Sequence, residues 1–402
     1  MSEWKKCPIG EVVTLRQGFA INAKSKHYMS KEETSLPLLR IADMKNGTKE
    51  VFVKEEIPQR FIAHPEDIIY TRTGNVGLVF RNNYGVMHNN CFSVTPNDAD
   101  ELSRDFLYYA LQNKTFFDTA NALARGAAQP DLPHTSFNSI EFAYPSLFVQ
   151  ERIAYILSRY DSLIENYQKQ IKLLEEAAQR LYKEWFIDLR FPGHENRNIV
   201  DGVPEGWEKK KLSELFSFVR GKSYTSKELS NEGTIMVNLK NIQSFGGYKS
   251  DVEKHFIGTF KEEQTLMKGD LIMGVTDMTQ ERRLVGSVAL IPDFKETATF
   301  SMDLIKLISF KLPNIYLYCA MRYGDVSRQI APLANGVNVL HLKPEAISNI
   351  EMVVASDSII EKFVSYTSKT IENILSLQSQ LRLLTEARDR LLPKLLSGEI
   401  EV

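Results

Sequence analysis

The chain has 402 residues, of which 43% are hydrophobic and 25% charged, a composition that excludes disordered, collagen-like and disulfide-scaffold proteins. Its 49 Lys and Arg residues against 51 Asp and Glu residues give a net charge of -2, so no overall basic field indicates nucleic acid. The charged start of the chain, the short apolar runs and the three widely spaced cysteines predict a cytoplasmic protein without signal peptide or membrane span.

The chain contains an internal repeat. Trp4, Glu11 and Gly18 recur 203 residues later as a tryptophan, a glutamate and a glycine. From Leu107 onward the displacement is 210 residues, and it holds as far as Glu176 and its counterpart Glu386. An ordered series with a single change of displacement indicates a tandem duplication of a unit of about 200 residues.

Each repeat begins with a β-rich part, residues 1–149 and again 207–358. Short runs of Val, Ile, Phe and Tyr alternate there with Gly, Asn, Asp and Pro, as in the run IIY at 68–70 and the run LIM at 271–273. This pattern predicts mostly β domains with irregular loops and one or two helices, such as one over 104–113. A linker rich in Pro, Gly and polar residues, 189–206, separates the two repeats.

Each repeat ends in a long helix, over 150–188 and within 359–402. Residues 151–186 contain no Gly or Pro, and their apolar residues keep heptad spacing over about 50 Å of helix. Pro393 is predicted to end the second helix near Leu392. The predicted seam consists of Ile153, Leu157, Tyr160, Ile164, Tyr167, Ile171, Leu174 and Leu181, then Phe363, Ile374, Leu377, Leu381, Leu384 and Leu391. One such helix cannot bury its stripe alone, so the fold is predicted as α+β, with the two helices packed as an antiparallel coiled coil.

Motifs for catalysis are missing. The sequence has no phosphate-binding loop, no G-x-G-x-x-G and no histidine spacing typical of zinc ligands. We therefore assign no catalytic residues and no metal ligands, and the sequence favours a binding or assembly protein.

Four motifs, taken in order on a duplicated β-then-helix chain, carry a family resemblance. They are PEGW at 204–207, EDIIYTRTGN at 66–75, EEAAQRLY at 175–182 and RDRLLPKLLSGEI at 388–400. With them, the chain resembles the specificity subunits of type I restriction–modification systems over essentially its whole length. It departs from a strict repeat where GVTD at 274–277 replaces TRTG at 71–74, so that loop does not have the same role in both halves.

The resemblance implies a non-catalytic subunit of a bacterial or archaeal complex. Its domains 1–149 and 207–358 would be target-recognition domains, each reading one half of a split, asymmetric site in double-stranded DNA. The helices would set the spacing between the halves and dock two methyltransferase subunits, which methylate adenine N6 with S-adenosylmethionine. Translocase–nuclease subunits would add restriction with ATP and magnesium, and this chain would bind no cofactor itself.

Candidate DNA contacts lie in loops of the two β-rich domains. One candidate loop follows a strand-like run and contains Arg72, Thr73 and Asn75, which offer a guanidinium suited to guanine, a hydroxyl and an amide. A tight turn with a solvated Arg72 fits this stretch equally well. Gly126 and Gly336 are expected to serve backbone geometry. Further base-edge candidates are Arg125, Gln129, Thr276 and Asn338, and the phosphate candidates are Lys24, Lys26, Arg220, Lys222, Lys227, Arg282 and Arg283.

Two other classes of function remain open from the residues alone. A coiled-coil scaffold that does not read DNA would show no dependence of sequence preference on the β-rich domains. An enzyme with an unrecognised site would show activity from this chain alone.

Replacing the arginine of the first candidate loop tests the DNA-contact assignment. We expect Arg72→Ala to weaken DNA binding by the assembled complex, because the guanidinium is the strongest base-edge donor of that loop. Affinity measured by fluorescence anisotropy and a mapped methylation motif provide the readouts. If both are unchanged, Arg72 is not a DNA contact.

Overall fold

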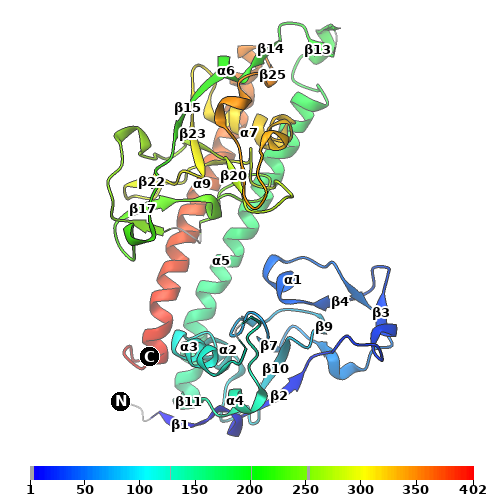
Figure 1. Cartoon of the computed structure of the whole chain (residues 1–402), viewed down its shortest axis with the longest axis vertical. Coiled ribbons are helices and arrows are strands. Elements are labelled where there is room, and N and C mark those ends of the chain that lie inside the picture. Colours follow the sequence, from blue (N-terminus) through cyan, green and yellow to red (C-terminus); the bar gives the residue numbers. More distant parts are fainter. Residues whose placement is uncertain (1–3, 127, 201, 251–253) are drawn as a thin grey trace. The chain divides into compact units, whose positions relative to one another are not determined.

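The computed structural model describes residues 4–126, 128–200, 202–250 and 254–402, and it divides into two compact units. The first unit comprises Met1–Asp161 and Ala387–Val402, and the second comprises Ser162–Glu386. Helices α5 (Leu147–Tyr182) and α9 (Asp357–Leu396) each contribute residues to both units (Figure 1). The fold is α+β with a duplicated β-rich domain, as predicted.

The first unit contains two main sheets. One is antiparallel, in the order β2 (Val13–Gln17), β10 (Cys91–Pro96), β7 (Ile68–Thr71) and β8 (Val79–Phe80). The other has the order β3 (Met29–Ser30), β5 (Phe52–Val53), β4 (Leu36–Leu39), β9 (Gly85–Met87) and β6 (Ile62–Ala63), with β4 and β9 parallel. A separate pair joins β1 (Lys5–Pro8) to β11 (Glu141–Tyr144). All four residues of β7 are buried, which explains its continuous apolar run.

Short helices pack against the two sheets of the first unit. After α1 (Ile41–Asn46) come α2 (Arg104–Ala110), α3 (Lys114–Leu123) and α4 (His134–Asn138). The predicted helix over 104–113 ends at Ala110, because Asn113 caps α3 by accepting a hydrogen bond from the Thr115 N–H. The core contains stacked and edge-on rings of Tyr70, Phe92 and Phe137, and α5 contributes Ile153 and Leu157 to it.

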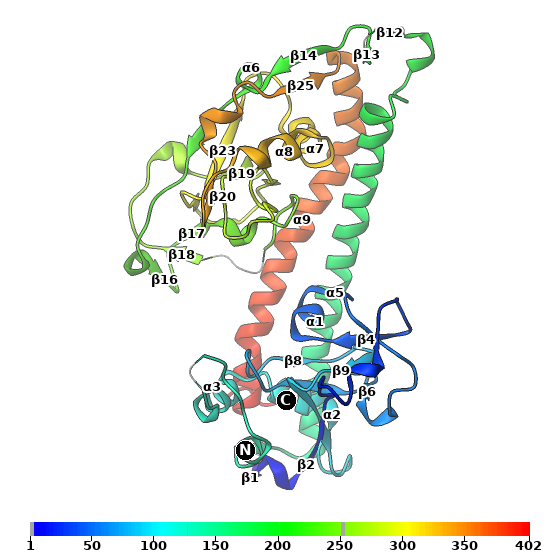
Figure 2. The same cartoon turned by 45° about the vertical axis from the view of Figure 1, so that its right-hand side comes forward.

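The second unit repeats this plan (Figure 2). Its antiparallel sheet has the order β15 (Phe216–Arg220), β23 (Leu304–Ser309), β19 (Leu271–Gly274) and β21 (Val288–Leu290). Its other large sheet has the order β16 (Leu229–Ser230), β18 (Lys254–Phe256), β17 (Thr234–Val237) and β22 (Ala298–Phe300), with β17 and β22 parallel. β14 (Glu208–Lys211) pairs with β25 (Glu351–Val354), and the helices are α6 (Leu212–Leu215), α7 (Asn314–Tyr323) and α8 (Val326–Ile330). The duplication seen in the sequence is therefore a duplication of topology.

Within the second unit the end of α5 packs on the start of α9, so the two helices run antiparallel. Phe363 is fully buried, and its ring centroid lies 5.9 Å from that of Tyr182, 5.9 Å from that of Trp185 and 4.9 Å from that of Phe186. A π-helical turn, Lys183–Ile187, extends α5 and carries two of these rings. Aromatic packing thus closes this end of the helix pair.

The predicted seam residues of the two helices are all buried or half-buried. Ile153, Leu157, Ile164, Ile171, Phe363 and Ile374 are buried. The half-buried ones are Tyr160, Tyr167, Leu174, Leu181, Leu377, Leu381, Leu384 and Leu391. No helix in the described part of the chain combines the length and the apolar character required to cross a membrane.

One expectation needs correction. Pro393 does not end α9 near Leu392, because the helix continues to Leu396 and its last turn buries Leu395 in the core of the first unit. That burial offsets the one backbone hydrogen bond that proline removes. The predicted linker, 189–206, contains ordered parts: β12 (Ile199–Val200) pairs with β13 (Val203–Pro204), and Phe191 is buried against Trp207.

A buried ion pair ties α7 to α5 in the second unit. Arg322 Nη1 lies 2.8 Å from Glu175 Oε1 and Nη2 lies 3.0 Å from Oε2, with side-chain exposures of only 10% and 15%. The hydroxyl of Tyr318 also accepts a hydrogen bond from the guanidinium. The pair satisfies two charges that would otherwise be buried alone.

Removing one partner of this pair should destabilise the second unit. We expect Glu175→Ala to lower the free energy of unfolding by about 3–5 kcal/mol, because Arg322 would remain buried without a counter-charge. Chemical denaturation followed by circular dichroism measures the effect. Glu176→Ala is the matched control, since Glu176 is 41% exposed and pairs only loosely with Arg180 at 3.9 Å. Equal losses in the two variants would mean that the pair contributes no specific stability.

Candidate nucleic-acid interface

Two candidate loops of the first unit form one element, called here the first loop pair. It consists of residues 72–75 after β7 and residues 125–126 and 128–131 after α3; Ala127 lies outside the described residues. Arg125 and Asp131 exchange two backbone hydrogen bonds of 2.8 Å. The Leu132 N–H donates to the Arg72 carbonyl at 2.9 Å, and the Gly74 N–H to the Pro130 carbonyl at 2.8 Å. The tertiary fold therefore brings together residues more than 50 positions apart in the sequence.

Asp131 lies at the centre of the first loop pair. Arg72 Nε donates to its Oδ1 at 3.1 Å, Arg72 Nη2 to its Oδ2 at 2.6 Å, and the Thr73 hydroxyl to Oδ1 at 2.6 Å. The Arg72 side chain is 20% exposed, so the alternative of a solvated arginine on a tight turn is wrong. Asn75, Arg125 and Gln129 are exposed around this cluster.

The cluster favours a charged carboxylate. Partial burial alone would raise the pKa of Asp131, but hydrogen bonds from Arg72 and Thr73 and the positive charge of Arg72 bring that pKa below its ordinary value of 3.8. Asp131 is therefore ionised at neutral pH, and the Arg72–Asp131 pair is an ion pair under physiological conditions.

The second unit contains an equivalent element, the second loop pair, formed by residues 275–284 and 335–341. β20 (Thr276–Asp277) pairs with β24 (Leu340–His341), and Asn335 exchanges backbone hydrogen bonds of 3.0 and 2.9 Å with His341. The Leu342 N–H donates to the Val275 carbonyl at 2.8 Å, the same bond that Leu132 makes to Arg72 in the first unit. The two loop pairs thus share a backbone framework.

The side chains of the second loop pair differ from those of the first. His341 stands where the first unit has Asp131, and its Nδ1 lies 3.4 Å from the Thr276 hydroxyl. Thr276 is buried, so its selection as a DNA contact is a correction: strand pairing turns this side chain inward. Asn338 is exposed, and the amide of Gln280 crosses the loop pair to donate to the Val337 carbonyl at 2.7 Å.

The two glycines that were expected to serve backbone geometry both have positive φ. Gly126 has φ +95° and Gly336 has φ +152°. A Cβ on Gly336 would lie 1.9 Å from the Val339 carbonyl oxygen, so no other residue fits there without a shift of the backbone. Both glycines allow the second loop of each pair to fold back on itself.

Five of the seven candidate cations are either exposed lysines or arginines in ion pairs. Lys24, Lys26 and Lys227 are exposed, and Lys222 is half-buried. Arg220 forms an ion pair with Glu345 at 2.6 Å, and Arg283 one with Glu281 at 2.6 Å. Arg282 is half-buried, with φ 54°. The lysines are therefore more available to phosphates than Arg220 and Arg283.

Sequence reasoning missed the residues that hold the loops. Asp131 lies outside the quoted motifs, and Asp277 entered them only as the last residue of GVTD at 274–277. Their roles follow from contacts with residues distant in the chain or brought close by a turn. Asp277 is 1% exposed and accepts hydrogen bonds from the Thr279 N–H at 2.8 Å, the Thr279 hydroxyl at 2.9 Å and the Leu284 N–H at 2.8 Å. Neither carboxylate stands next to a candidate arginine in the sequence, so no local signal pointed to either of them.

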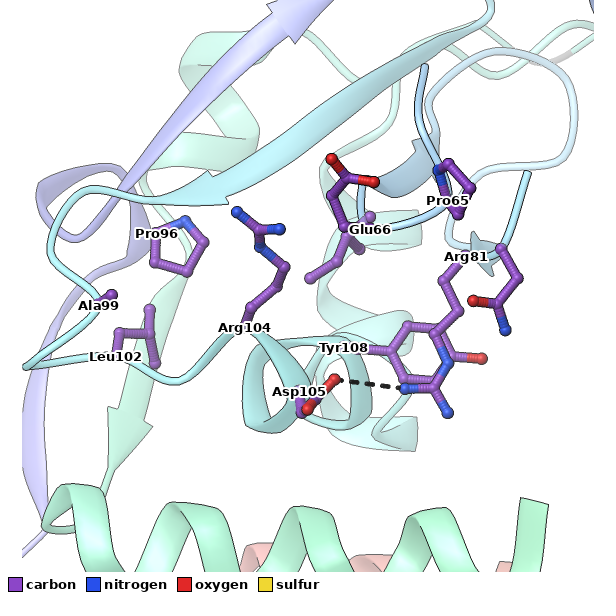
Figure 3. A pocket seen from close by; sticks show the side chains of 11 residues that line it. Pro65, Glu66, Arg81, Pro96, Ala99, Leu102, Arg104, Asp105 and Tyr108 are labelled. Atoms are coloured by element: carbon purple, nitrogen blue, oxygen red, sulfur yellow. Dashed lines mark ion pairs between the residues drawn. The ribbon is translucent and has the colours of Figure 1, made fainter. Parts of the chain in front are cut away.

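The first unit also contains a cavity of about 430 Å³ (Figure 3). Its lining residue Arg81 has a structural role. The Arg81 guanidinium lies 4.0 Å from the ring centroid of Tyr108 and forms an ion pair with Asp105 at 3.6 Å. The same guanidinium reaches Asp161 of α5 at 3.3 Å, and Arg388 of α9 lies 3.0 Å from Asp161. These charges connect the β-rich domain to the helices, so Arg81 is not a free cation for a ligand.

Two copies of one β-rich fold, each with a paired-loop surface and each followed by a long helix, define a duplicated recognition protein. Residues 1–176 and 204–380 match the family model described as the type I restriction modification DNA specificity domain, and the chain belongs to that family. It is thus a type I restriction–modification specificity subunit with two target-recognition domains. Such subunits are the non-catalytic members of these systems, and they assemble with other subunits and DNA.

Individual relatives agree with this assignment. The specificity subunit of the type I restriction enzyme MjaIX from Methanocaldococcus jannaschii is 28% identical over 77% of this chain and 72% of its own length. The MjaVIII specificity subunit of the same organism is 22% identical over 100% of this chain and 93% of its own. The crystal structure of the type I restriction–modification S subunit from M. genitalium shares the fold, with a TM-score of 0.60 and 18% identity, covering 98% of this chain and 96% of that one.

The role of Asp277 in holding the second loop pair can be tested. We expect Asp277→Ala to cost about 1–3 kcal/mol of stability, because it leaves buried N–H groups unpaired, and to speed hydrogen exchange across residues 278–284. Hydrogen–deuterium exchange with mass spectrometry measures the change. Glu281→Ala removes an exposed carboxylate from the same loop and should leave the exchange of that segment unaltered. Unchanged exchange in Asp277→Ala would show that other contacts hold the loop.

Proposed function

We propose that this chain is the DNA-reading subunit of a type I restriction–modification complex. The first domain binds one half of a split, asymmetric site in double-stranded DNA, and the second domain binds the other half. The observation that carries the proposal is the pair of equivalent loop elements with unequal side chains. Arg72 and Asp131 of the first loop pair correspond to Val275 and His341 of the second, so one backbone framework presents two different recognition surfaces.

The chemistry of the loop pairs supports base reading. Sequence-specific contacts in the major groove need donors and acceptors that reach base edges, and Arg, Asn and Gln are the side chains best suited to this. Arg125 and Gln129 are exposed on the first loop pair, and Asn338 is exposed on the second. The exposed lysines Lys24 and Lys227 are suited to phosphates, which position a protein on DNA without specifying sequence.

The net charge of -2 supports a shared interface. Phosphate contacts dominate the affinity of most DNA-binding proteins, and this chain has no excess of cations with which to supply them alone. We therefore assign much of the phosphate contact to two methyltransferase subunits. These would flip the target adenine from the duplex and methylate N6 with S-adenosylmethionine. Translocase–nuclease subunits would use ATP and magnesium to restrict unmodified DNA, in the cytoplasm of a bacterium or archaeon.

The helices support docking of two similar partners. Leu173 on α5 and Leu383 on α9 occupy equivalent positions of the repeat, and their exposures are 55% and 51%. Exposed leucines at matching places on both helices are suited to two copies of one partner, because each copy then meets the same local surface. Both leucines lie within the second unit, 162–386.

Mapping of methylation tests the proposal. This chain is co-expressed with its cognate methyltransferase subunit in a host that lacks adenine methylation, and N6-methyladenine is mapped across the genome. We expect a motif with two short defined halves. Replacing residues 207–358 by the corresponding domain of a relative should change one half and leave the other intact.

The other outcomes are equally informative. A motif that does not respond to the domain replacement would favour a scaffold that does not read DNA. A continuous palindromic motif would mean that the two domains do not act as separate readers. Methylation by the purified chain without its partner would mean that the chain is itself an enzyme.

A further inference from the structure

The way Asp131 holds Arg72 leaves part of the guanidinium free to donate. A guanidinium has five N–H groups. Asp131 accepts from Nε and from Nη2, and Gln17 Oε1 accepts from Nη1 at 3.3 Å. In the part of the chain that the structure describes, the Arg72 side chain makes these three hydrogen bonds. One N–H on Nη1 and one on Nη2 therefore remain, and these two nitrogens form the outer end of the side chain.

The position of this end is fixed from several sides. The Thr73 hydroxyl holds Oδ1 of Asp131 at 2.6 Å, and Asp131 is fixed to Arg125 by two backbone hydrogen bonds. The backbone of Arg72 donates to the Asn90 carbonyl at 2.8 Å and accepts from Leu132 at 2.9 Å. Such a side chain loses little conformational freedom when it binds, so more of the contact energy appears as affinity and discrimination.

Two neighbouring donors require two neighbouring acceptors. In the major groove, guanine presents O6 and N7 side by side, and this is the base edge that arginine recognises in a bidentate manner. Adenine offers N7 beside an amino donor, which would face an arginine N–H unfavourably. The geometry therefore selects guanine among the four bases.

We propose that Asp131 is a positioning residue that directs the free end of Arg72 toward a guanine in the half-site bound by the first domain. This inference rests on the proposed function and makes it specific to one base of one half-site. Asp131 does not touch the DNA; it acts through Arg72.

The second domain provides an internal contrast. Val275, which is 6% exposed, replaces Arg72, and His341 replaces Asp131. This position of the second loop pair has neither the paired donors nor the carboxylate that orients them. The second domain therefore does not read its half-site with an arginine oriented by a carboxylate. This difference gives a physical origin for an asymmetric target.

The test compares methylation motifs of the complete complex with the methyltransferase subunit. In the unaltered complex, we expect the half-site bound by the first domain to contain a guanine. Asp131→Asn removes the charge and replaces one acceptor by an N–H that repels the guanidinium. Discrimination for that guanine should fall about 10- to 100-fold, the range expected for losing one bidentate contact. The other half-site should not change, and Asp131→Glu should restore part of the discrimination.

Asp118→Asn is the matched control. Asp118 lies on α3 of the same unit, is 56% exposed, and pairs with Lys114 rather than with the loop pair. Asp118→Asn makes the same change of net charge without touching the loop pair. The methylation motif of the complex with this variant should therefore equal that of the unaltered complex. If Asp131→Asn fails to assemble, Arg72→Lys carries the test: lysine keeps the positive charge but lacks the planar fork. It should relax the same position of the motif.

The outcomes separate this inference from the function on which it rests. A complex of unaltered chains without a split motif would contradict the proposed function itself. A split motif that stays unchanged in Asp131→Asn and Arg72→Lys would overturn the role of Asp131 alone. A third outcome is a loss of affinity that is the same for all DNA sequences, with a salt dependence of binding that corresponds to about one phosphate contact fewer. It would identify Arg72 as a contact to the DNA backbone and overturn the guanine assignment.

Discussion

The structure depends on the burial of the apolar stripe that runs along α5. A helix with one apolar stripe is not stable alone in water, and helices of this length depend on tertiary packing for most of their stability. Ile153 and Leu157 enter the core of the first unit, whereas Ile171 and Ala178 enter the core of the second. One uninterrupted helix therefore belongs to two hydrophobic cores, and each β-rich domain folds against a surface that the helix provides.

Acidic residues paired with arginines perform the corresponding polar task. Asp161 receives Arg81 and Arg388 in the first unit, and Glu175 receives Arg322 in the second. Each of these carboxylates is at most 15% exposed, so each pair satisfies charges that burial would otherwise penalise. Arg72 differs because its carboxylate partner occupies only one edge of the guanidinium.

The two halves show how a duplicated fold acquires two surfaces. The backbone hydrogen bond that Leu132 makes in the first loop pair is repeated by Leu342 in the second, while the side chains that the loops present have diverged. Strand order and the parallel pair in the second sheet are also repeated. Backbone geometry has been retained and side-chain chemistry has changed, which is the division expected when a rigid scaffold carries variable recognition loops.

The sequence by itself determined the duplication, the long helices and the α+β class, because heptad spacing and repeated positions are local or periodic signals. It also indicated that a glycine recurs at positions 18 and 221, but the requirement for glycine there comes from the tertiary structure. A Cβ would lie 2.2 Å from the His88 carbonyl oxygen at Gly18 and 2.0 Å from the Ser301 carbonyl oxygen at Gly221. Only the tertiary structure decided that α9 passes Pro393, that Thr276 is buried and that Asp131 holds Arg72. These outcomes depend on packing and pairing between residues distant in the chain. The burial of Leu395 outweighs the tendency of Pro393 to end a helix, and the ion pair with Asp131 outweighs the solvation of Arg72.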